Sequence, residues 1–279
     1  RYVWHMEEPV CEPPAIALYF VAELAAEHVK VVLSGEGGDE AFAGYSNYRN
    51  NTWYERAKRG AGPTRPMVSD LLNRVPDQGP RINKYLQSFD VPLHEYYLSR
   101  TATPYSYFNA HRDELLSPDW AAVLGERDDA LEKFWQATEG QDVLNRMLYV
   151  DTKSWLPDDL LLKADKITMA HSLELRVPLL DHRVLEFAAS LPTSRKLKGL
   201  QTKYLLKEAL RAQVPDEIRR RKKTGFPVPY ERWIAEASGG SIRDLLLDDA
   251  AIARGYFQRS HVEAMLKRNA EHGDVSREV

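Results

Sequence analysis

A glycine-rich turn that carries three carboxylates is the part of this chain best suited to chemistry. After the apolar residues Val31–Leu33 the sequence continues Ser34-Gly35-Glu36-Gly37-Gly38-Asp39-Glu40. The apolar run predicts a buried strand, and residues 41–48 predict a helix. Glu36 and Asp39 would then lie at the helix N-terminus, where free N–H groups and the helix dipole stabilise negative charge. Open α/β sheets bind ligands at such turns, although an ordinary turn before a capped helix has the same pattern.

The rest of the chain, which must position this turn, is predicted to be mainly helical. Apolar spacing predicts helices over residues 15–29, 113–136 and 141–155. Val31–Leu33 is the one clear strand, and we expect its partners in a parallel sheet to lie upstream. Prolines and glycines break residues 51–90 into a connecting region. Four tyrosines that follow are expected to pack inside the protein rather than to bind a ligand: Tyr96, Tyr97, Tyr105 and Tyr107.

The composition indicates a globular enzyme piece. Hydrophobic residues make up 43% and charged residues 28%, which is ordinary globular usage. The net charge of −3 argues against nucleic acid as a partner. The single cysteine, Cys11, excludes an intramolecular disulfide and favours a reducing, cytoplasmic location. No apolar run approaches the roughly 18 residues that a membrane span needs.

Three further segments carry motifs. One extends from Leu156-Pro157-Asp158-Asp159 to Pro178-Leu179-Leu180-Asp181, and another joins Thr202-Lys203-Tyr204-Leu205-Leu206-Lys207 to Lys223-Thr224-Gly225-Phe226-Pro227. A weaker one opens the chain with Glu7-Glu8-Pro9. Together with residues 34–45, these segments resemble the synthetase domain of glutamine-hydrolysing asparagine synthetases, in the family's order and roughly its spacing. The resemblance covers most of residues 1–230.

The resemblance implies a mostly helical remnant of an α/β fold. It would belong to an adenine-nucleotide α-hydrolase-like (ATP pyrophosphatase) domain with a parallel sheet and a large helical C-terminal portion. Residues 1–50 would supply a strand-turn-helix edge of the α/β core, and residues 51–279 the helical portion with the 156–181 and 202–229 motifs. The family's phosphate loop, Ser-Gly-Gly-x-Asp-Ser, and its glutaminase domain are not in this sequence. We therefore expect a fragment cut at both ends that is inactive alone.

The implied activity is an ATP-dependent, amide-forming ligase. Aspartate would become asparagine through an aspartyl-AMP, with ammonia from glutamine and release of AMP and pyrophosphate. The triphosphate requires Mg²⁺ and cationic side chains near the leaving pyrophosphate. The substrates would be small molecules, and a homodimer is an open expectation.

The resemblance also assigns roles to individual residues. Glu36 would be the base that takes a proton from ammonia. Asp39 would bind Mg²⁺, which usually takes one or two protein carboxylates. Lys166 would contact the phosphates, and Lys163 lies on the same helical face and could serve instead. A solvated helix charge is the alternative for both lysines. Several other residues complete these expectations: Ser34 and Gly35 near the nucleotide, Glu40 as a helix cap or salt-bridge partner, and Glu174, Arg176 and Asp181 as architecture.

Other readings stay open at this point. Ala41-Phe42-Ala43-Gly44-Tyr45 stands where the family commonly has Leu-Phe-Gly-Gly-Tyr, which hints at a branch away from housekeeping asparagine synthetases. Such branches include β-lactam synthetases, which carry tyrosine in place of Glu36, and amidotransferases that act on peptides or cell-surface sugars. A non-catalytic binding domain is a further alternative. The basic run Arg219–Lys223 suggests either an anion-facing loop or a nucleic-acid patch.

Overall fold

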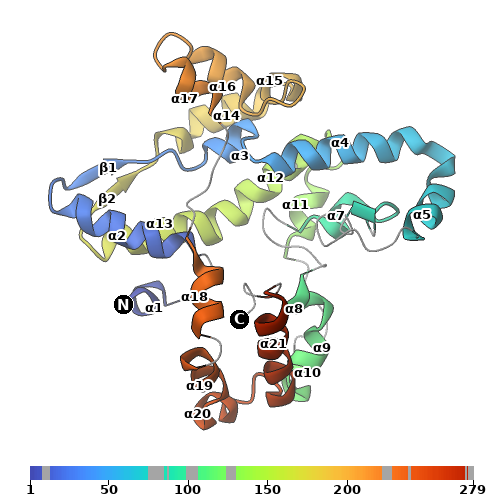
Figure 1. The fold of residues 1–279 in the computed structure, drawn as a ribbon. Helices are drawn as coiled ribbons and strands as arrows, with labels where there is room; N and C mark the ends of the chain where they lie inside the picture. Colours follow the sequence, from blue (N-terminus) through green and yellow to red (C-terminus); the bar gives the residue numbers. More distant parts are fainter. Residues whose placement is uncertain are drawn as a thin grey trace. The chain divides into compact units, whose positions relative to one another are not determined.

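The computed structural model describes residues 1–7, 13–74, 85–86, 88–98, 106–123, 130–221, 228–237, 240–273 and 275 (Figure 1). The chain forms two compact units. The first contains Arg1–Val10, Ala15–Ala102 and Ala130–Gly225, and the second contains Cys11–Pro14, Thr103–Asp129 and Phe226–Val279. The described elements are mainly helices, with one small parallel sheet in the first unit.

The sheet joins two segments that lie far apart in the sequence. Strand β1 (Val31–Leu33) pairs in parallel with β2 (Glu174–Arg176), with Val32 opposite Leu175. The expectation that the strand's partners lie upstream is wrong for this pair, because β2 lies downstream in the 156–181 motif. The strand itself is confirmed, but it is not buried throughout, since Val31 is 44% and Leu33 72% exposed. Side chains alternate between the faces of a strand, and Val32 takes the covered side.

Helices α1 (Tyr2–Met6), α2 (Pro14–Ala26) and α13 (Leu162–Met169) supply the apolar layer beneath this sheet. Met6, Ala22 and Ile167 belong to its buried cluster, and Val32 packs against it. The helix predicted over residues 15–29 is therefore α2, which ends three residues earlier. The layer fixes β1 and hence the start of the glycine-rich turn.

Two helices predicted from the sequence differ in the structure. The helix predicted over 41–48 is broken: α3 (Gly38–Phe42) ends because Ala43 adopts a left-handed conformation with φ 57°, and α4 (Ser46–Ala61) begins after Tyr45. The helix predicted over 113–136 is also broken. The break separates α9 (Arg112–Leu115) from α10 (Pro118–Val123), because Pro118 lacks the N–H that a continuing helix would need. Residues 124–129 lie outside the described residues, and α11 (Glu132–Gln136) follows them.

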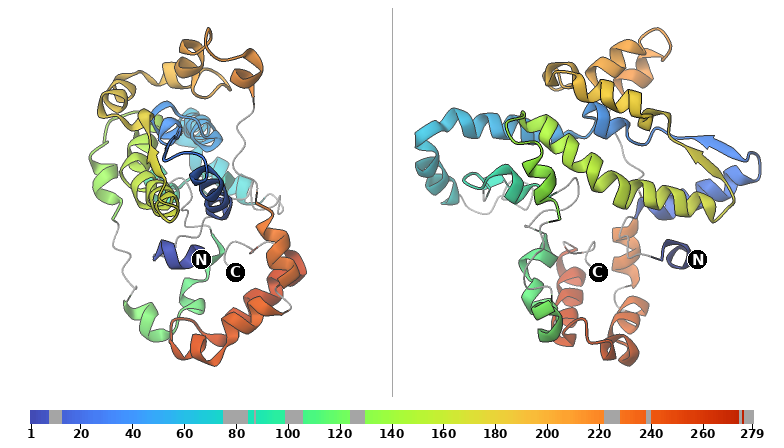
Figure 2. Two further views of the ribbon diagram at one scale, coloured as in Figure 1. Left: turned by 90° about the vertical axis from the view of Figure 1, so that its left-hand side faces the viewer. Right: turned by 180° about the vertical axis from the view of Figure 1, so that it is seen from behind.

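The helix predicted over 141–155 is confirmed as α12 (Val143–Lys153). Asp142 caps it, since its carboxylate accepts hydrogen bonds from the N–H groups of Leu144 and Asn145. A π-helical turn (η2, Leu156–Leu161) then joins α12 to α13, and the two helices run on from one another in Figure 1. Helix α12 packs against α3 and α4, and the views in Figure 2 show α4 alongside it. Helix α12 thus packs against α3, the helix that follows the glycine-rich turn.

The other described helices complete the two units. In the first unit they are α5 (Arg65–Asn73), α7 (Leu93–Tyr96), α14 (His182–Ser190), α15 (Thr193–Lys196), α16 (Tyr204–Ala209) and α17 (Asp216–Arg220), with the 3₁₀ turns η1 (Gly62–Thr64) and η3 (Pro178–Leu180). In the second unit they are α8 (Tyr107–Ala110), α18 (Tyr230–Ala237), α19 (Ser241–Leu247), α20 (Asp249–Ala253) and α21 (Arg259–His272), besides α9 and α10.

The second unit has its own small core. Helix α21 packs on α9 and α19. Leu115 and Met265 are buried together in one cluster, and Leu247, Val262 and Leu266 form another. Among the described helices of the whole chain, none combines the length and the apolar character that crossing a membrane requires.

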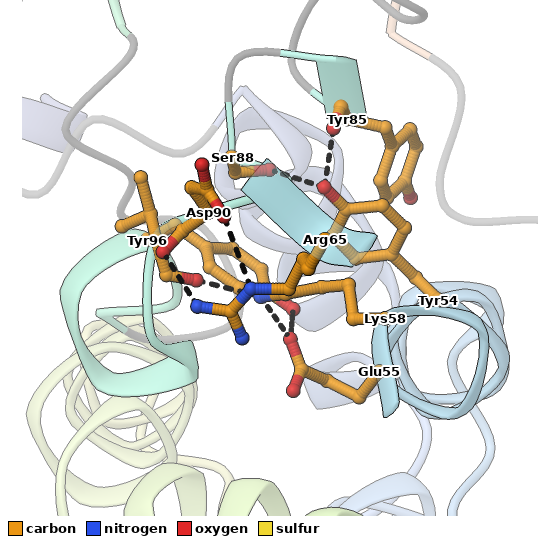
Figure 3. Close-up of polar contacts among 9 residues, drawn as sticks. Tyr54, Glu55, Lys58, Arg65, Tyr85, Ser88, Asp90 and Tyr96 are labelled. Carbon is orange, nitrogen blue, oxygen red and sulfur yellow. Dashed lines mark hydrogen bonds and ion pairs between the residues drawn. The ribbon is translucent and has the colours of Figure 1, made fainter. Parts of the chain in front are cut away.

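The buried side chain of Lys58, on α4, forms polar contacts with the segment that contains Val91 and Tyr96 (Figure 3). The ammonium group of Lys58 donates to Glu55 Oε1 at 2.6 Å and to the carbonyl oxygen of Val91 at 2.6 Å. It also lies 4.9 Å from the ring centre of Tyr96, whose hydroxyl donates to Glu55 at 2.9 Å. The prediction that Tyr96 packs inside is therefore confirmed, and the same holds for buried Tyr97, while Tyr105 lies outside the described residues.

Next to the glycine-rich turn, two acidic residues are buried where α3, α4 and α12 meet. Asp151 accepts hydrogen bonds from the hydroxyls of Tyr48 and Tyr97, each at 2.6 Å. Glu40 is 1% exposed, and its burial, with the nearby charge of Asp39 adding to it, raises its pKa to about 7. Glu40 makes no ion pair in the described part of the chain, so the expected salt bridge is wrong, while its expected role as a helix cap stays a prediction.

We expect the variant Lys58→Met to lower the free energy of unfolding by about 3 kcal/mol. Methionine fills the same space, but the carboxylate of Glu55 and the carbonyl of Val91 then lose their buried cationic partner. Urea denaturation would measure the change. The matched control is Lys267→Met, whose side chain is 77% exposed and which should stay within about 0.5 kcal/mol of the wild type. A loss below about 1 kcal/mol for Lys58→Met would contradict this account of the cluster.

We also expect Glu40 to make the protein less stable as the pH rises. Its pKa is 4.5 when exposed and about 7 when folded, so its contribution is complete below pH 4.5 and is lost as the pH rises through about 7. Between pH 5 and 8 the wild type should lose about 2 kcal/mol more than Glu40→Gln, which stays neutral. Urea midpoints across this range would show it. Glu186→Gln, at an exposed position of α14, should follow the wild type; parallel curves for wild type and Glu40→Gln would disprove the assignment.

Candidate functional site

The glycine-rich turn follows the carboxyl end of β1 and is shaped by close packing. A side chain on Gly37, which has φ 79°, would place its Cβ 1.9 Å from Leu180 Cδ2, and one on Gly38 would come within 2.7 Å of Leu179 Cδ1. Both leucines belong to η3, the segment that follows β2. Since the two strands are parallel, their carboxyl ends meet at one edge, and the two following segments pack directly on one another there.

Asp39 lies in the first turn of α3 and forms an ion pair across the site. Its Oδ1 is 3.0 Å from Nζ of Lys203, with the two side chains 11% and 22% exposed. Lys203 precedes α16 and holds a left-handed backbone with φ 52°. Gly44 makes room for the pair, because a Cβ there would lie 1.7 Å from Asp39 Oδ1 and 2.2 Å from Lys203 Cε. The structure thus identifies Lys203, which the sequence reasoning placed in a motif but did not select.

The other residues of the turn keep positions that suit a ligand site. The backbone N–H of Ser34 donates to the carbonyl of Arg176 at 2.8 Å, which continues the β1–β2 ladder. Gly35 is exposed, and no atom lies within 4 Å of where its Cβ would be. Glu36 is half-buried in the turn between Gly35 and α3. The predicted roles of Ser34, Gly35 and Glu36 toward substrate stay predictions.

The two lysines predicted to contact phosphate lie on α13, and neither contacts the Asp39–Lys203 pair in the described contacts. Lys163 is buried, with its Nζ 3.9 Å from Asp159. Lys166 donates to the carbonyl oxygen of Met6 at 2.9 Å and to Glu7 Oε2 at 2.7 Å, and this hydrogen bond lowers the pKa of Glu7. Helix α13 packs on α1, η2 and β2, whereas α3 packs on α12, α14, α16 and η3. The structure therefore pairs Asp39 with Lys203 and engages Lys166 with the N-terminal segment.

The donors for Mg²⁺ are limited in this part of the protein. Within the described residues, no three His, Cys, Asp or Glu side chains are grouped closely enough to hold a metal ion. Asp39 is a suitable single oxygen ligand, but its carboxylate is held against a lysine ammonium. Mg²⁺ binds through one or two carboxylates together with waters and substrate phosphates. The described residues therefore offer one candidate ligand and do not assemble a metal site by themselves.

The residues predicted to be architectural make contacts within their own segments, and their role stays a prediction. Arg176 and Glu174 form an ion pair within β2 at 3.4 Å. Asp181 caps α14 by accepting from the N–H of Arg183 at 2.9 Å. The prediction of a loop is wrong for Arg219 and Arg220, which end α17 and pair with Asp216 at 2.5 and 3.2 Å, whereas Arg221 follows the helix. Lys222, Lys223, Gly225 and Phe226 lie outside the described residues.

Comparison with known proteins gives a consistent family. The family model described as asparagine synthase matches residues 1–279. The chain is 36% identical over 280 residues to "Asparagine synthetase [glutamine-hydrolyzing] 1" of Bacillus subtilis, covering 100% of this chain and 43% of that protein. It is 38% identical over 264 residues to a "Putative asparagine synthetase [glutamine-hydrolyzing]" of Mycobacterium bovis, covering 90% of this chain and 39% of that protein.

A more distant relative has a different name. "Amidase chyE" of Penicillium rubens is 27% identical over 283 residues, which cover 91% of this chain and 40% of that protein. The chain thus spans about two fifths of the length of these relatives. Since the family model matches from the first residue to the last, the chain belongs to the asparagine synthase family.

Proposed function

We propose that this chain forms part of an ATP-dependent ligase that converts aspartate to asparagine with ammonia derived from glutamine. The Bacillus and Mycobacterium relatives named asparagine synthetase support this reading. The single observation that carries it is the Asp39–Lys203 pair at 3.0 Å, held over Gly44 at the carboxyl edge of the β1–β2 pair. This edge is where α/β folds bind their ligands. The parallel strand pair, with the site at its carboxyl edge, also leads us to propose an adenine-nucleotide α-hydrolase-like domain.

The proposed reaction has two steps. A carboxylate oxygen of aspartate attacks the α-phosphorus of ATP, and pyrophosphate leaves to give aspartyl-AMP. Ammonia then attacks the acyl carbon, gives up a proton, and AMP leaves with the bonding electrons of the acyl–oxygen bond. When bound, Mg²⁺ would neutralise charge on the phosphates.

We assign the following roles within this scheme. Glu36 takes the proton from the attacking nitrogen, as a carboxylate at the site's edge can do. Asp39 offers an oxygen to Mg²⁺, and it orients the Lys203 ammonium toward the negative charge that develops on the leaving oxygens. Lys166 makes its proposed phosphate contact only if it releases Glu7 and the carbonyl of Met6, and Lys163 only if it turns away from Asp159.

A second candidate is an amidotransferase of the same scaffold that acts on another carboxylate. The similarity to a fungal protein named an amidase supports keeping it. The two candidates share the chemistry and differ in the acceptor, so the choice of acid in the assay separates them.

We expect pyrophosphate release by the full-length protein that carries this chain, when supplied with Mg-ATP, aspartate and ammonium. Glu36→Gln and Asp39→Asn should each lower the rate at least about 100-fold, since each removes a charged group at the reacting centre. Glu186→Gln, an exposed change on α14, should leave the rate unchanged. Release with another acid but not with aspartate would favour the amidotransferase. Absence of release with every acid tried would leave the binding-domain alternative.

We expect Gly44→Ala to abolish this activity as well, because the new methyl group cannot share space with Asp39 Oδ1 and Lys203 Cε. The rate should fall at least about 100-fold, with the thermal midpoint lowered too. Gly60→Ala is the matched control, since Gly60 lies in α4 with no atom within 4 Å of the added Cβ. That change should keep the rate and stabilise the helix by about 0.5 kcal/mol. A fully active Gly44→Ala would show that the Asp39–Lys203 geometry is not needed.

A further inference from the structure

A pocket lined by cations lies in the first unit, beside the candidate site. Its volume is about 700 Å³. We call it the basic pocket, and its walls come from α4 and the segment before it, from the turn before α16, and from α16 and α17. Its lining includes Gly44, Arg49, Lys207, Arg219, Arg220 and Arg221.

The charges of the basic pocket do not balance. Among the described residues, five cationic side chains line it, while Glu208 is the one acidic residue in its wall. Arg219 pairs with Glu208 at 3.3 Å and with Asp216 at 2.5 Å, and Arg220 also pairs with Asp216. Five cations against two carboxylates leave a surplus of three positive charges. Like charges gathered in this way repel one another, and a bound anion would relieve the repulsion.

Two of the cations form no ion pair in the described part of the chain, although the charge of Asp39 acts on Lys207. The guanidinium of Arg49 donates to the amide oxygen of Asn50 at 2.9 Å and to the carbonyl oxygen of Leu200 at 3.3 Å, both of which are neutral. Lys207 makes no ion pair with a described residue. Its partial burial, with the charges of Lys203 and Arg219 adding to it, lowers its pKa. Both side chains therefore keep unused capacity to bind an anion.

The neutral groups of the pocket suit the same kind of ligand. Ser46 and Thr202 contribute hydroxyls and Gln201 an amide, all able to donate hydrogen bonds. The first turn of the 16-residue helix α4 borders the pocket through Ser46 and Arg49, and the positive end of the helix dipole favours negative charge there.

We propose that the basic pocket is a binding site for a small anion with a phosphate or diphosphate group, separate from the ion pair of Asp39 and Lys203. The surplus of three charges matches a diphosphate better than a single carboxylate. Arginine forks bind phosphate oxygens in a bidentate manner. The anion has two sources: the pyrophosphate or nucleotide of the proposed reaction, or a separate phosphorylated metabolite. The pocket's lining does not depend on the proposed function.

Isothermal titration of the full-length protein with inorganic pyrophosphate, without aspartate or Mg²⁺, tests this proposal. We expect one site per chain, with Kd rising at least tenfold in Lys207→Gln and in Arg49→Gln. Lys207→Arg, which keeps the charge, should restore binding. Lys267→Gln removes a charge from the other unit, where Lys267 is 77% exposed, and should leave Kd unchanged. Lys203→Gln, which removes the cation of the candidate site, should raise Kd less than Lys207→Gln does. Circular dichroism of each variant confirms that it is folded.

The outcomes separate the alternatives. Unchanged binding in both Lys207→Gln and Arg49→Gln would overturn the proposal. So would a larger loss of binding in Lys203→Gln than in Lys207→Gln and Arg49→Gln, because the anion would then lie at the candidate site. A repeat titration with a sugar bisphosphate distinguishes the sources: tighter pyrophosphate binding assigns the reaction's own product, and tighter sugar bisphosphate binding assigns a separate metabolite. Both results rely on the same pocket variants, and neither requires the ligase activity.

Discussion

The parallel pairing of β1 with β2 is the constraint on which the candidate site depends. It brings residues 31–33 beside residues 174–176, so that the turn after one strand and the 3₁₀ turn after the other leave the sheet at the same edge. Leu179 and Leu180 then pack where side chains on Gly38 and Gly37 would otherwise stand. Two of the three glycines of the motif are thus needed for this contact, whereas Gly35 faces open space. Without the strand pairing, the acidic turn would have no fixed relation to the segments that complete it.

The acidic residues of the turn differ because their surroundings differ. Asp39 faces Lys203 and keeps a cationic partner, whereas Glu40, the next residue, points into the meeting of α3, α4 and α12 beside Asp151. Burial favours the neutral form of a carboxyl group, and a nearby cation favours the charged form. One helix therefore holds the Asp39 side chain against a lysine and buries that of Glu40, whose pKa is raised to about 7. The difference between these two adjacent acids follows from this change of environment alone.

The sequence predicted the elements that depend on local pattern and failed where distant contacts decide. The strand at 31–33, helix α12 and the inward packing of Tyr96 and Tyr97 follow from periodicity and residue type. The break after Phe42 did not, because alanine gives no sign of the left-handed conformation that Ala43 adopts, with the N–H of Gly44 bonded to the carbonyl of Asp39. Lys203 and β2 were not identified from the sequence, because each has its partner more than 140 residues away in the chain. The roles toward aspartate, ATP and ammonia came from the family's motifs and not from periodicity.

Helix α16 links the candidate site to the basic pocket. Lys203, immediately before it, reaches Asp39, and Lys207, one turn later, lines the pocket. The two ammonium groups repel each other, and this repulsion contributes to the lowered pKa of Lys207. Gly44 borders both places, since it touches the Asp39–Lys203 pair and lines the pocket. An anion bound beside Lys207 would offset part of the positive charge that Lys203 experiences. The charge balance of the candidate site is therefore set partly by what occupies its neighbour.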